Sequence, residues 1–264
     1  MSSSRPRRNA GFTLVELLVT ISIIAILAAM LLSALGRSKE QAKLTQCLSN
    51  LKQLGGGFEM YRDDNGDRFP PHPQNWASFQ YGGGDPNWKA LGGMGEMLVA
   101  ATNRPLWSYI RNPEVFRCPA DRGMDLSADY STPFRNIFSN IGTSYNYTFN
   151  PWSRTKEPLA DPVDGLAGKS CSWVNYPARY IYLAEPPALP DELDFPGDDH
   201  YFMWHYNSGK STVHSPGEIR QKIIAPVLFV EGHAAVYDFT RTVKSPWPAE
   251  PTANWIWYKP AQGH

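Results

Sequence analysis

The chain has 264 residues, with 25 basic and 25 acidic side chains and a formal net charge of zero at pH 7. This balance gives no overall electrostatic support for binding nucleic acid or another strongly anionic partner, so we expect no nucleic-acid partner. The length permits one large domain or two smaller ones. Beyond the N-terminal segment no tract rich in Ser, Gly and Pro divides the chain cleanly, which favours one main domain.

An uncharged apolar segment lies near the N-terminus, interrupted by one acidic residue. From Phe12 to Leu35 it has 24 residues, which as a helix would measure about 36 Å, enough to cross a hydrocarbon core of about 30 Å. The residues before it include Arg5, Arg7 and Arg8 and no acidic residue. The positive-inside rule therefore predicts a cytoplasmic N-terminus, with the rest of the chain beyond the membrane.

Glu16 is the acidic residue within this segment. A charged side chain in a spanning helix costs on the order of 2.5–3.5 kcal/mol at the helix centre, less near an interface, and it usually has a partner. Two interpretations are open. Either Glu16 has a specific partner, or the segment is a plain signal anchor whose Glu16 lies near the lipid headgroups.

The positions of small residues indicate where a peptidase could cleave the segment. A secretory signal has its cleavage site after the apolar stretch, where Ala28-Ala29 or Ser33-Ala34 could serve. Here a small residue, Gly11, also stands before the stretch. The segment Gly11–Leu18, G-F-T-L-V-E-L-L, closely resembles the prepilin signature of type IV pilins and type II secretion pseudopilins.

This resemblance implies cleavage by prepilin peptidase between Gly11 and Phe12 on the cytoplasmic side, followed by N-methylation of the new Phe12 amine. Glu16 matches the family glutamate that meets the N-terminal amine of a neighbouring subunit in the filament. An amine and a carboxylate inside lipid both gain by pairing, and a pair between chains favours a fixed axial stagger. The implied partners are the peptidase and methyltransferase, other pilin-like subunits and the inner membrane.

Beyond Leu35 the sequence becomes polar but keeps an apolar stripe, so we expect the helix to continue over residues 36–61. The stripe consists of Leu44, Leu48, Leu51, Leu54, Phe58 and Tyr61. Its spacing of three or four residues predicts packing against a sheet of the same chain. Because each glycine costs about 1 kcal/mol relative to alanine, Gly55-Gly56-Gly57 predicts fraying or a bend.

The stretch Tyr61–Pro71, YRDDNGDRFPP, is expected to end the helix, since turn-forming residues precede two prolines. Its Asp and Asn oxygens could alternatively bind calcium, although no glutamate follows at the spacing of an EF-hand loop. We favour the turn.

The remaining residues, 62–264, are rich in Pro, Gly and aromatic residues and predict short strands joined by long loops. The segments most typical of strands are Ser144–Phe149, Arg179–Ala184, Val227–Val230 and Ala234–Phe239. The last two flank Glu231-Gly232-His233, which predicts a β-hairpin. The expected fold is α+β and pilin-like, with a long N-terminal helix packed on a small antiparallel sheet. The expected parts are a leader (1–11), a transmembrane and filament-packing helix (12–35), its amphipathic continuation (36–61) and an extracytoplasmic head (62–264).

Several pieces of the head also resemble the large pilin-like proteins of Planctomycetes and Verrucomicrobia that carry a C-terminal H-x9-DG-type motif. These pieces are Cys47–Leu54, Val115–Asp121, Ser144–Tyr147 and Leu228–Ala234. The chain departs from the motif, because Glu231 replaces the usual Asp before Gly232 and neither His205 nor His214 has the expected spacing. The motif brings no biochemical role to transfer.

Three cysteines, Cys47, Cys118 and Cys171, would face an oxidising compartment in this topology, so one disulfide and one remaining thiol are expected. Three pairings are open. The family-like surroundings of Cys47 and Cys118 favour their pairing, which would tie the helix to a following loop.

One group of side chains could be drawn as a zinc or hydrolytic site. It consists of His200, His205, His214 and His233, with Asp198 and Asp199 nearby. No spacing among them matches H-E-x-x-H, and the chain has neither G-x-S-x-G nor a P-loop. We therefore expect no metal, no cofactor and no enzymatic activity.

Aromatic residues among glycines and polar residues leave two alternatives open. They are Trp76, Tyr81, Trp88, Trp247, Trp255, Trp257 and Tyr258. Exposed rings could bind polysaccharide or another protein, whereas buried rings would fill the core. The sequence as a whole predicts a pilin-like or pseudopilin subunit of a type II secretion or type IV pilus-like filament, or else a minor pilin that starts or caps one. The alternative from another class is a membrane-anchored extracytoplasmic glycan-binding module or enzyme that uses a pilin-type signal.

Overall fold

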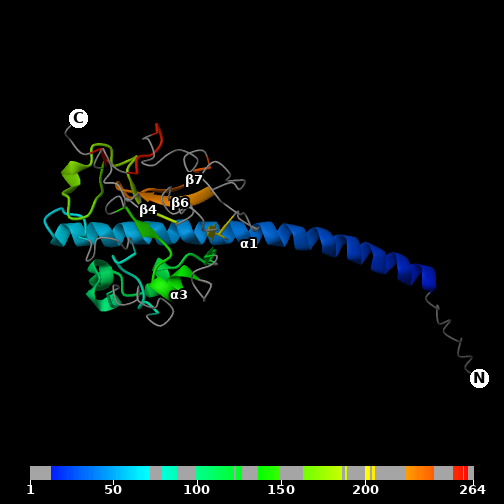
Figure 1. Ribbon diagram of the computed structural model, residues 1–264. Helices are drawn as coiled ribbons and strands as arrows, with labels where there is room; N and C mark the ends of the chain where they lie inside the picture. Colours follow the sequence, from blue (N-terminus) through cyan, green and yellow to red (C-terminus); the bar gives the residue numbers. More distant parts are fainter. Residues whose placement is uncertain are drawn as a thin grey trace, which may run out of the picture. The chain divides into compact units, whose positions relative to one another are not determined.

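The computed structural model shows one long helix and a head of short strands and turns (Figure 1). The residues that it describes are 13–71, 79–87, 99–121, 123–126, 136–148, 163–185, 188, 200–202, 204–205, 224–240, 252–257 and 259–260. The chain divides into two compact units, Met1–Ala42 and Lys43–His264. The second unit contains the last 22 of the 51 residues of the helix, Lys43–Asp64, together with the sheets.

Helix α1 runs without interruption from Leu14 to Asp64, so the membrane-length segment and its amphipathic continuation are one element, as predicted. The helix passes through Gly55–Gly57, and the fraying expected there is wrong. Packing is the physical reason: a Cβ atom on Gly57 would lie 2.3 Å from Cδ1 of Ile110, and one on Gly55 would lie 3.3 Å from Cδ1 of Leu228. Tertiary contacts thus outweigh the weak helix propensity of glycine at these positions.

A turn follows the helix in the stretch where one was predicted. Gly66 and Asp67 adopt left-handed backbone conformations, with φ of 65° and 56°. The backbone N–H of Asp67 donates to the carbonyl of Arg62 at 2.9 Å, and the side-chain amide of Asn65 donates to the carbonyl of Tyr61 at 2.7 Å. These bonds satisfy carbonyls that the end of a helix leaves without partners.

The main sheet is antiparallel, with strand order β2-β4-β6-β7. Its strands are β2 (Asn146–Tyr147), β4 (Ile181–Ala184), β6 (Ile224–Phe229) and β7 (Ala234–Asp238). β2, β4 and β7 lie within segments predicted as strands, although Phe149, the end of the first segment, lies outside the described residues. β6 overlaps the predicted segment Val227–Val230 but begins three residues earlier, at Ile224, and ends at Phe229. The pairs Leu228↔Ala234 and Ile224↔Asp238 fix the register of the predicted β6–β7 hairpin, whose turn contains Gly232 with φ of 97°.

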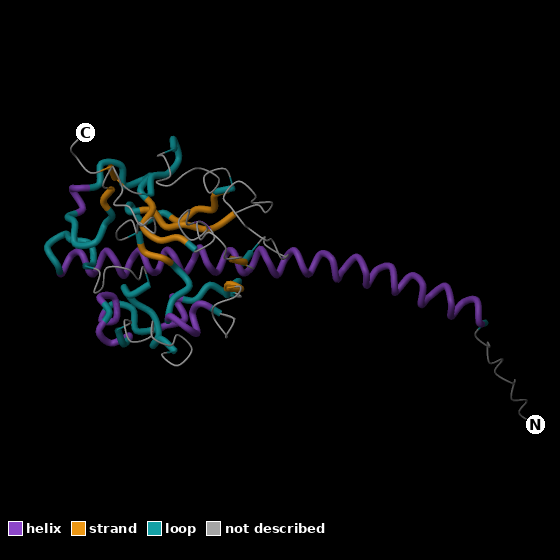
Figure 2. The backbone as a smooth tube through the Cα atoms, viewed as in Figure 1, coloured by secondary structure: helices purple, strands orange, loops and turns teal. Residues whose placement is uncertain are grey.

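The other elements are short, and the sequence did not predict them. Two further sheets have two strands each, β1 (Met124–Leu126) with β5 (His200–Phe202), and β3 (Val163–Asp164) with β8 (Lys259–Pro260). The short helical segments are η2 (Ala101–Asn103), η3 (Pro105–Ser108), η4 (Pro113–Phe116), α3 (Ile137–Ile141) and η5 (Cys171–Trp173). Figure 2 shows how much of the head consists of loops between these pieces.

The C-terminal part of α1 passes between the main sheet and the region of α3 (Figure 1). Leu44, Leu51, Leu54 and Phe58 of the predicted stripe are buried, and Leu48 and Tyr61 are half-buried. The buried members belong to one hydrophobic core with residues of β2, β4 and β6. The predicted α+β arrangement, a long helix packed on a small antiparallel sheet with long loops, is confirmed.

Two neighbouring glycines of α1 allow a direct test of this packing. A Cβ on Gly56 meets nothing within 4 Å, whereas one on Gly57 meets the side chain of Ile110. Both substitutions to alanine gain helix propensity, about 1 kcal/mol each. Only Gly57→Ala must also displace a packed side chain, at a cost of about 1–3 kcal/mol.

We therefore expect Gly56→Ala to raise the midpoint of thermal unfolding of the detergent-solubilised full chain, and Gly57→Ala to fall below Gly56→Ala by several degrees, at about 2–4 °C per kcal/mol. Tryptophan fluorescence can follow the transition. Equal midpoints for the two variants would mean that the side chain of Ile110 does not restrict the size of residue 57.

Candidate functional site

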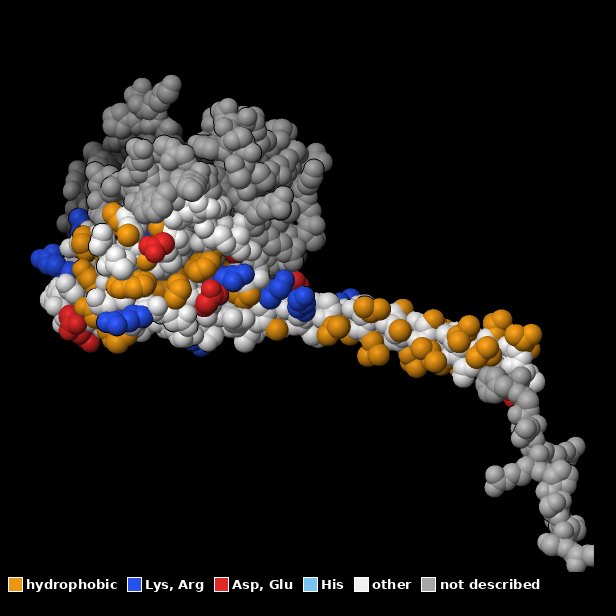
Figure 3. Space-filling model, turned by 90° about the horizontal axis from the view of Figure 1, so that it is seen from below, with side chains coloured by type: hydrophobic (Ala, Val, Ile, Leu, Met, Phe, Trp, Pro, Cys, Tyr) orange, Lys and Arg blue, Asp and Glu red, His pale blue; other side chains and the backbone are white. Residues whose placement is uncertain are grey.

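The first half of α1 exposes its apolar side chains on all sides. The large hydrophobic residues from Leu14 to Leu35 have half or more of their surface accessible in this chain. Figure 3 shows hydrophobic side chains along this part of the helix, while charged side chains gather further along. By length and composition, α1 is able to cross a membrane. A helix apolar all round needs either lipid or other helices as its surroundings.

Polar side chains in this half bond back to the helix itself. The hydroxyls of Ser22 and Ser33 each donate to a backbone carbonyl at 2.8 Å, and that of Thr20 donates to the carbonyl of Leu17 at 3.0 Å. Inside a bilayer no water is present to satisfy such groups. The internal bonds therefore suit this segment to an apolar environment.

Glu16 and Thr13 form a reciprocal cap at the start of α1. The backbone N–H of Thr13 donates to Oε2 of Glu16 at 2.9 Å, and its hydroxyl donates to the same oxygen at 2.7 Å. In return, Oγ1 of Thr13 accepts from the backbone N–H of Glu16 at 3.2 Å. This is a capping box, with Thr13 as N-cap and Glu16 at the third helical position. Within a single chain, the carboxylate is thus already held at the helix start.

The predicted cleavage and methylation positions, Gly11 and Phe12, lie outside the described residues. Processing between them stays a prediction. The described helix begins two residues after Phe12, at Leu14.

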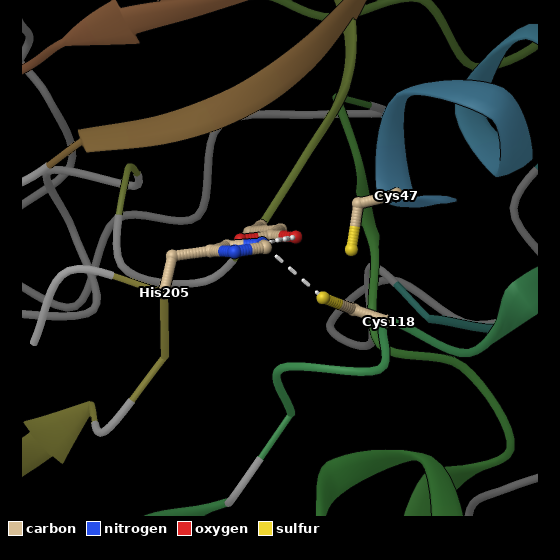
Figure 4. A group of neighbouring side chains, drawn as sticks. Cys47, Cys118 and His205 are labelled. Atoms are coloured by element: carbon tan, nitrogen blue, oxygen red, sulfur yellow. Dashed lines mark hydrogen bonds and ion pairs between the residues drawn. The ribbon is translucent and has the colours of Figure 1, made fainter. Parts of the chain in front are cut away.

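The head contains a buried group of four side chains with ligand-type atoms. They are Cys47, Cys118, Glu185 and His205, and one sulfur, nitrogen or oxygen atom from each lies within 4.8 Å of the corresponding atom of every other. Figure 4 shows the side chains of Cys47, Cys118 and His205 pointing toward one another, with Cys47 on α1. Cys118 follows η4, Glu185 follows β4 and His205 follows β5. We call this group the Cys-His-Glu cluster.

Direct contacts join the members of the cluster. Nε2 of His205 lies 3.0 Å from Oε1 of Glu185 and 3.4 Å from Sγ of Cys118. Burial opposes the charged imidazolium, but the Glu185 carboxylate outweighs this effect and raises the pKa of His205 to about 10. Burial raises the pKa of the Cys118 thiol. Among the described residues, Oε2 of Glu185 and Nδ1 of His205 have no hydrogen-bond partner.

All three cysteines are free thiols in this structure. Cys47 and Cys118, the pair that the sequence favours for a disulfide, lie together in the Cys-His-Glu cluster. A disulfide between them stays a prediction. Cys171 is half-exposed, and its sulfur accepts a hydrogen bond from Nη1 of Arg62 at 2.9 Å.

The histidines grouped by sequence do not share one site in the described part of the chain. His205 is buried with the two cysteines, whereas the ring of His233 stacks on Phe229 at 4.3 Å and its Nδ1 lies 2.6 Å from Oε1 of Glu231. His214, Asp198 and Asp199 lie outside the described residues, as does the side chain of His200. Sequence reasoning missed the role of Glu185, which has no motif around it.

The aromatic residues that can be assessed are core residues. Tyr81, Trp255 and Trp257 are 1, 8 and 1% exposed, which favours the core interpretation over exposed binding rings. Trp76, Trp88, Trp247 and Tyr258 lie outside the described residues.

Comparison with known proteins finds similarity in the N-terminal part of the chain. Residues 6–32 match the prokaryotic N-terminal methylation motif. The chain is 38% identical over 68 residues to the type II secretion system core protein G of Klebsiella pneumoniae, which covers 26% of this chain and 48% of that protein. It is 48% identical over 59 residues to the type IV wide pilus major component PilA4 of Thermus thermophilus, covering 22% and 45% of the two chains.

The chain spans about half the length of the curated relatives that it matches. No solved structure matches it significantly. The predicted prepilin-type N-terminus is confirmed, since the methylation motif includes Gly11, Phe12 and Glu16. The resemblance of the head to H-x9-DG-type proteins stays a prediction.

Proposed function

We propose that this chain is a pilin-like subunit that is processed at its N-terminus and assembled, through α1, into a type II secretion or type IV pilus-like filament. The observation that carries the proposal is the division of one continuous helix, Leu14–Asp64. Its first half is apolar and exposed beside a prepilin-type junction, and its second half packs one face into the core of a head. A subunit needs this division, because one part joins it to the membrane or filament while the other holds its own fold.

In this proposal residues 1–11 are a cytoplasmic leader, removed by prepilin peptidase before Phe12 is methylated. Residues 12–35 anchor the subunit in the inner membrane and later pack among neighbouring helices. Residues 36–61 continue the helix into the head, and residues 62–264 form an extracytoplasmic head in the periplasm or on a surface filament. The arginines before the apolar segment support this orientation.

Glu16 provides the link between anchoring and assembly. After cleavage, the Phe12 amine would be a positive charge at the membrane end of the helix, and a neighbouring subunit's Glu16 could neutralise it. The capping box bears on this step, because the same carboxylate oxygen already accepts two hydrogen bonds from Thr13. A second oxygen, Oε1, leaves the carboxylate able to meet an amine while it keeps the cap.

The chain itself needs no catalytic chemistry in this role, because the peptidase and methyltransferase act on it. The partners are these processing enzymes and other pilin-like subunits. The named relatives include both a secretion component and a pilus component, and the filament that we propose for this chain could be of either kind. The buried state of Tyr81, Trp255 and Trp257 gives no support to a glycan-binding surface built from those rings.

The proposal predicts a defined mature N-terminus. Mass spectrometry of the membrane-extracted protein from cells that contain prepilin peptidase should find a chain that begins with N-methyl-Phe12. Cells without the peptidase should yield only the full-length chain. A chain that remains uncut in both strains, or one cut after Leu35, would instead favour an anchored or secreted module.

The role of Glu16 can be separated from its role as a cap. Glu16→Gln keeps the side-chain length and can preserve a capping box, but it removes the charge. We expect this variant to be processed normally and to lower the amount of assembled filament at least about tenfold, equivalent to about 1.4 kcal/mol. Quantitative immunoblotting of sheared filaments against the membrane pool measures the change.

Thr13→Ala is the matched control, since it removes the threonine hydroxyl of the cap, at a cost of about 0.5–2 kcal/mol, and leaves the charge of Glu16 in place. It should assemble nearly as well as the unmodified chain. Equal losses in both variants would assign Glu16 to helix capping alone, and full assembly of Glu16→Gln would remove it from the assembly mechanism.

A further inference from the structure

The Cys-His-Glu cluster brings together side chains from four separate segments of the head. Cys47 is on α1, Cys118 follows η4, Glu185 follows β4 and His205 lies beyond β5. All four residues are at most 8% exposed. We propose that these four side chains bind one zinc ion in a closed, structural site that joins α1 to the sheet.

An unsatisfied acceptor in the cluster supports a ligand. Glu185 is fully buried, and among the described residues its Oε2 has no hydrogen-bond partner. Leaving a buried charged oxygen without a partner is costly, and native proteins rarely do so. A cation held between the carboxylate and the two sulfurs would remove this cost.

The kinds of ligand atom match zinc. Thiolate, imidazole and carboxylate groups are its usual ligands in proteins, and four protein ligands without an open position are typical of a structural site. The soft sulfur ligands disfavour magnesium and calcium, which prefer oxygen. Zinc binding would release the two thiol protons and the proton that His205 shares with Glu185. The affinity for zinc should therefore increase with pH.

The distances also fit a tetrahedral ion after small movements. Zinc bonds of about 2.0–2.3 Å place tetrahedral ligand atoms about 3.3–3.8 Å apart. Nε2 of His205 lies 3.4 Å from Sγ of Cys118 and 3.0 Å from Oε1 of Glu185. The four candidate ligand atoms all lie within 4.8 Å of one another, so movements of about 1 Å would bring them to tetrahedral spacing.

A disulfide between Cys47 and Cys118 would use the same two sulfurs and therefore exclude the metal. It would explain the cysteines but not the burial of Glu185 and His205 beside them, because a disulfide is neutral and needs no charged neighbours. A metal-free ion pair between Glu185 and His205 would explain those two residues but not the convergence of both thiols. A zinc ion would use all four side chains.

The experiment measures zinc in the full chain, purified in detergent from cells grown with added zinc and without chelator. We expect about one zinc ion per chain by elemental mass spectrometry, with Cys47 and Cys118 recovered as reduced thiols after denaturation and alkylation. Cobalt(II) added to the metal-free, reduced chain should give the absorption bands of tetrahedral cobalt with thiolate ligands.

Cys118→Ser and His205→Gln should each lower zinc affinity by at least about 10–100-fold, the loss reported when only a supporting residue of a metal site is changed. His205→Gln keeps a polar group beside Glu185, so it separates loss of the ligand from loss of the fold, which near-ultraviolet circular dichroism checks. Cys171→Ser is the matched control, because Cys171 lies outside the cluster and bonds to Arg62. It should bind zinc normally.

Three results would overturn the proposal. They are a Cys47–Cys118 disulfide in the purified chain, a zinc-free chain with both thiols reduced that does not take up added zinc, and normal zinc binding by Cys118→Ser together with His205→Gln. Each can be obtained whether or not the chain assembles into filaments.

Discussion

Phe58, on the buried face of α1, is the contact on which the arrangement of the head depends. Its ring lies 4.1 Å from that of Tyr182 on β4, 5.4 Å from that of Tyr81 and 5.7 Å from that of Tyr147 on β2, centroid to centroid. Phe58 and these three tyrosines are at most 2% exposed. The strands are only two to six residues long, and a sheet this small gains stability by packing its apolar face against a helix. The C-terminal part of the helix is therefore the main support of the head.

The sequence predicted the parts of the structure whose signal is local. The stripe that ends at Phe58 and Tyr61 repeats every three or four residues, and the β6–β7 hairpin is marked by apolar runs around Gly232. The two small sheets β1-β5 and β3-β8 were not predicted in this way, because their strands have two or three residues and too short a pattern of their own. β2 is equally short, but it lies within the longer predicted segment Ser144–Phe149. The fraying predicted from Gly57 was wrong because a distant residue decides its role. The missing side chain leaves room for Ile110 to pack against the helix, and the local sequence does not show this contact.

The Cys-His-Glu cluster shows the same limit more sharply. Metal motifs such as H-E-x-x-H are recognised because their ligands lie on one element at a fixed spacing. Here each side chain of the cluster comes from a different segment, so the spacing along the sequence carries no information. The available signals were the family-like surroundings of Cys47 and Cys118 and the histidine His205, one of two considered for the H-x9-DG-type motif. Nothing in the sequence marks Glu185 as their neighbour, and only the folded chain brings it to them.

The place of Cys47 along α1 gives the proposed zinc site a mechanical meaning. Leu44 and Cys47 are the first buried residues that the described part of α1 contains, twelve or fewer residues beyond the apolar segment that ends at Leu35. In the proposed filament, the chain connects the packed first part of α1 to the head through this turn of the helix. Hydrophobic contacts there can slide, because dispersion attraction has little directional preference. Coordinate bonds to Cys118, Glu185 and His205 have fixed lengths and angles, so a metal at this position would resist withdrawal of the helix from the sheet.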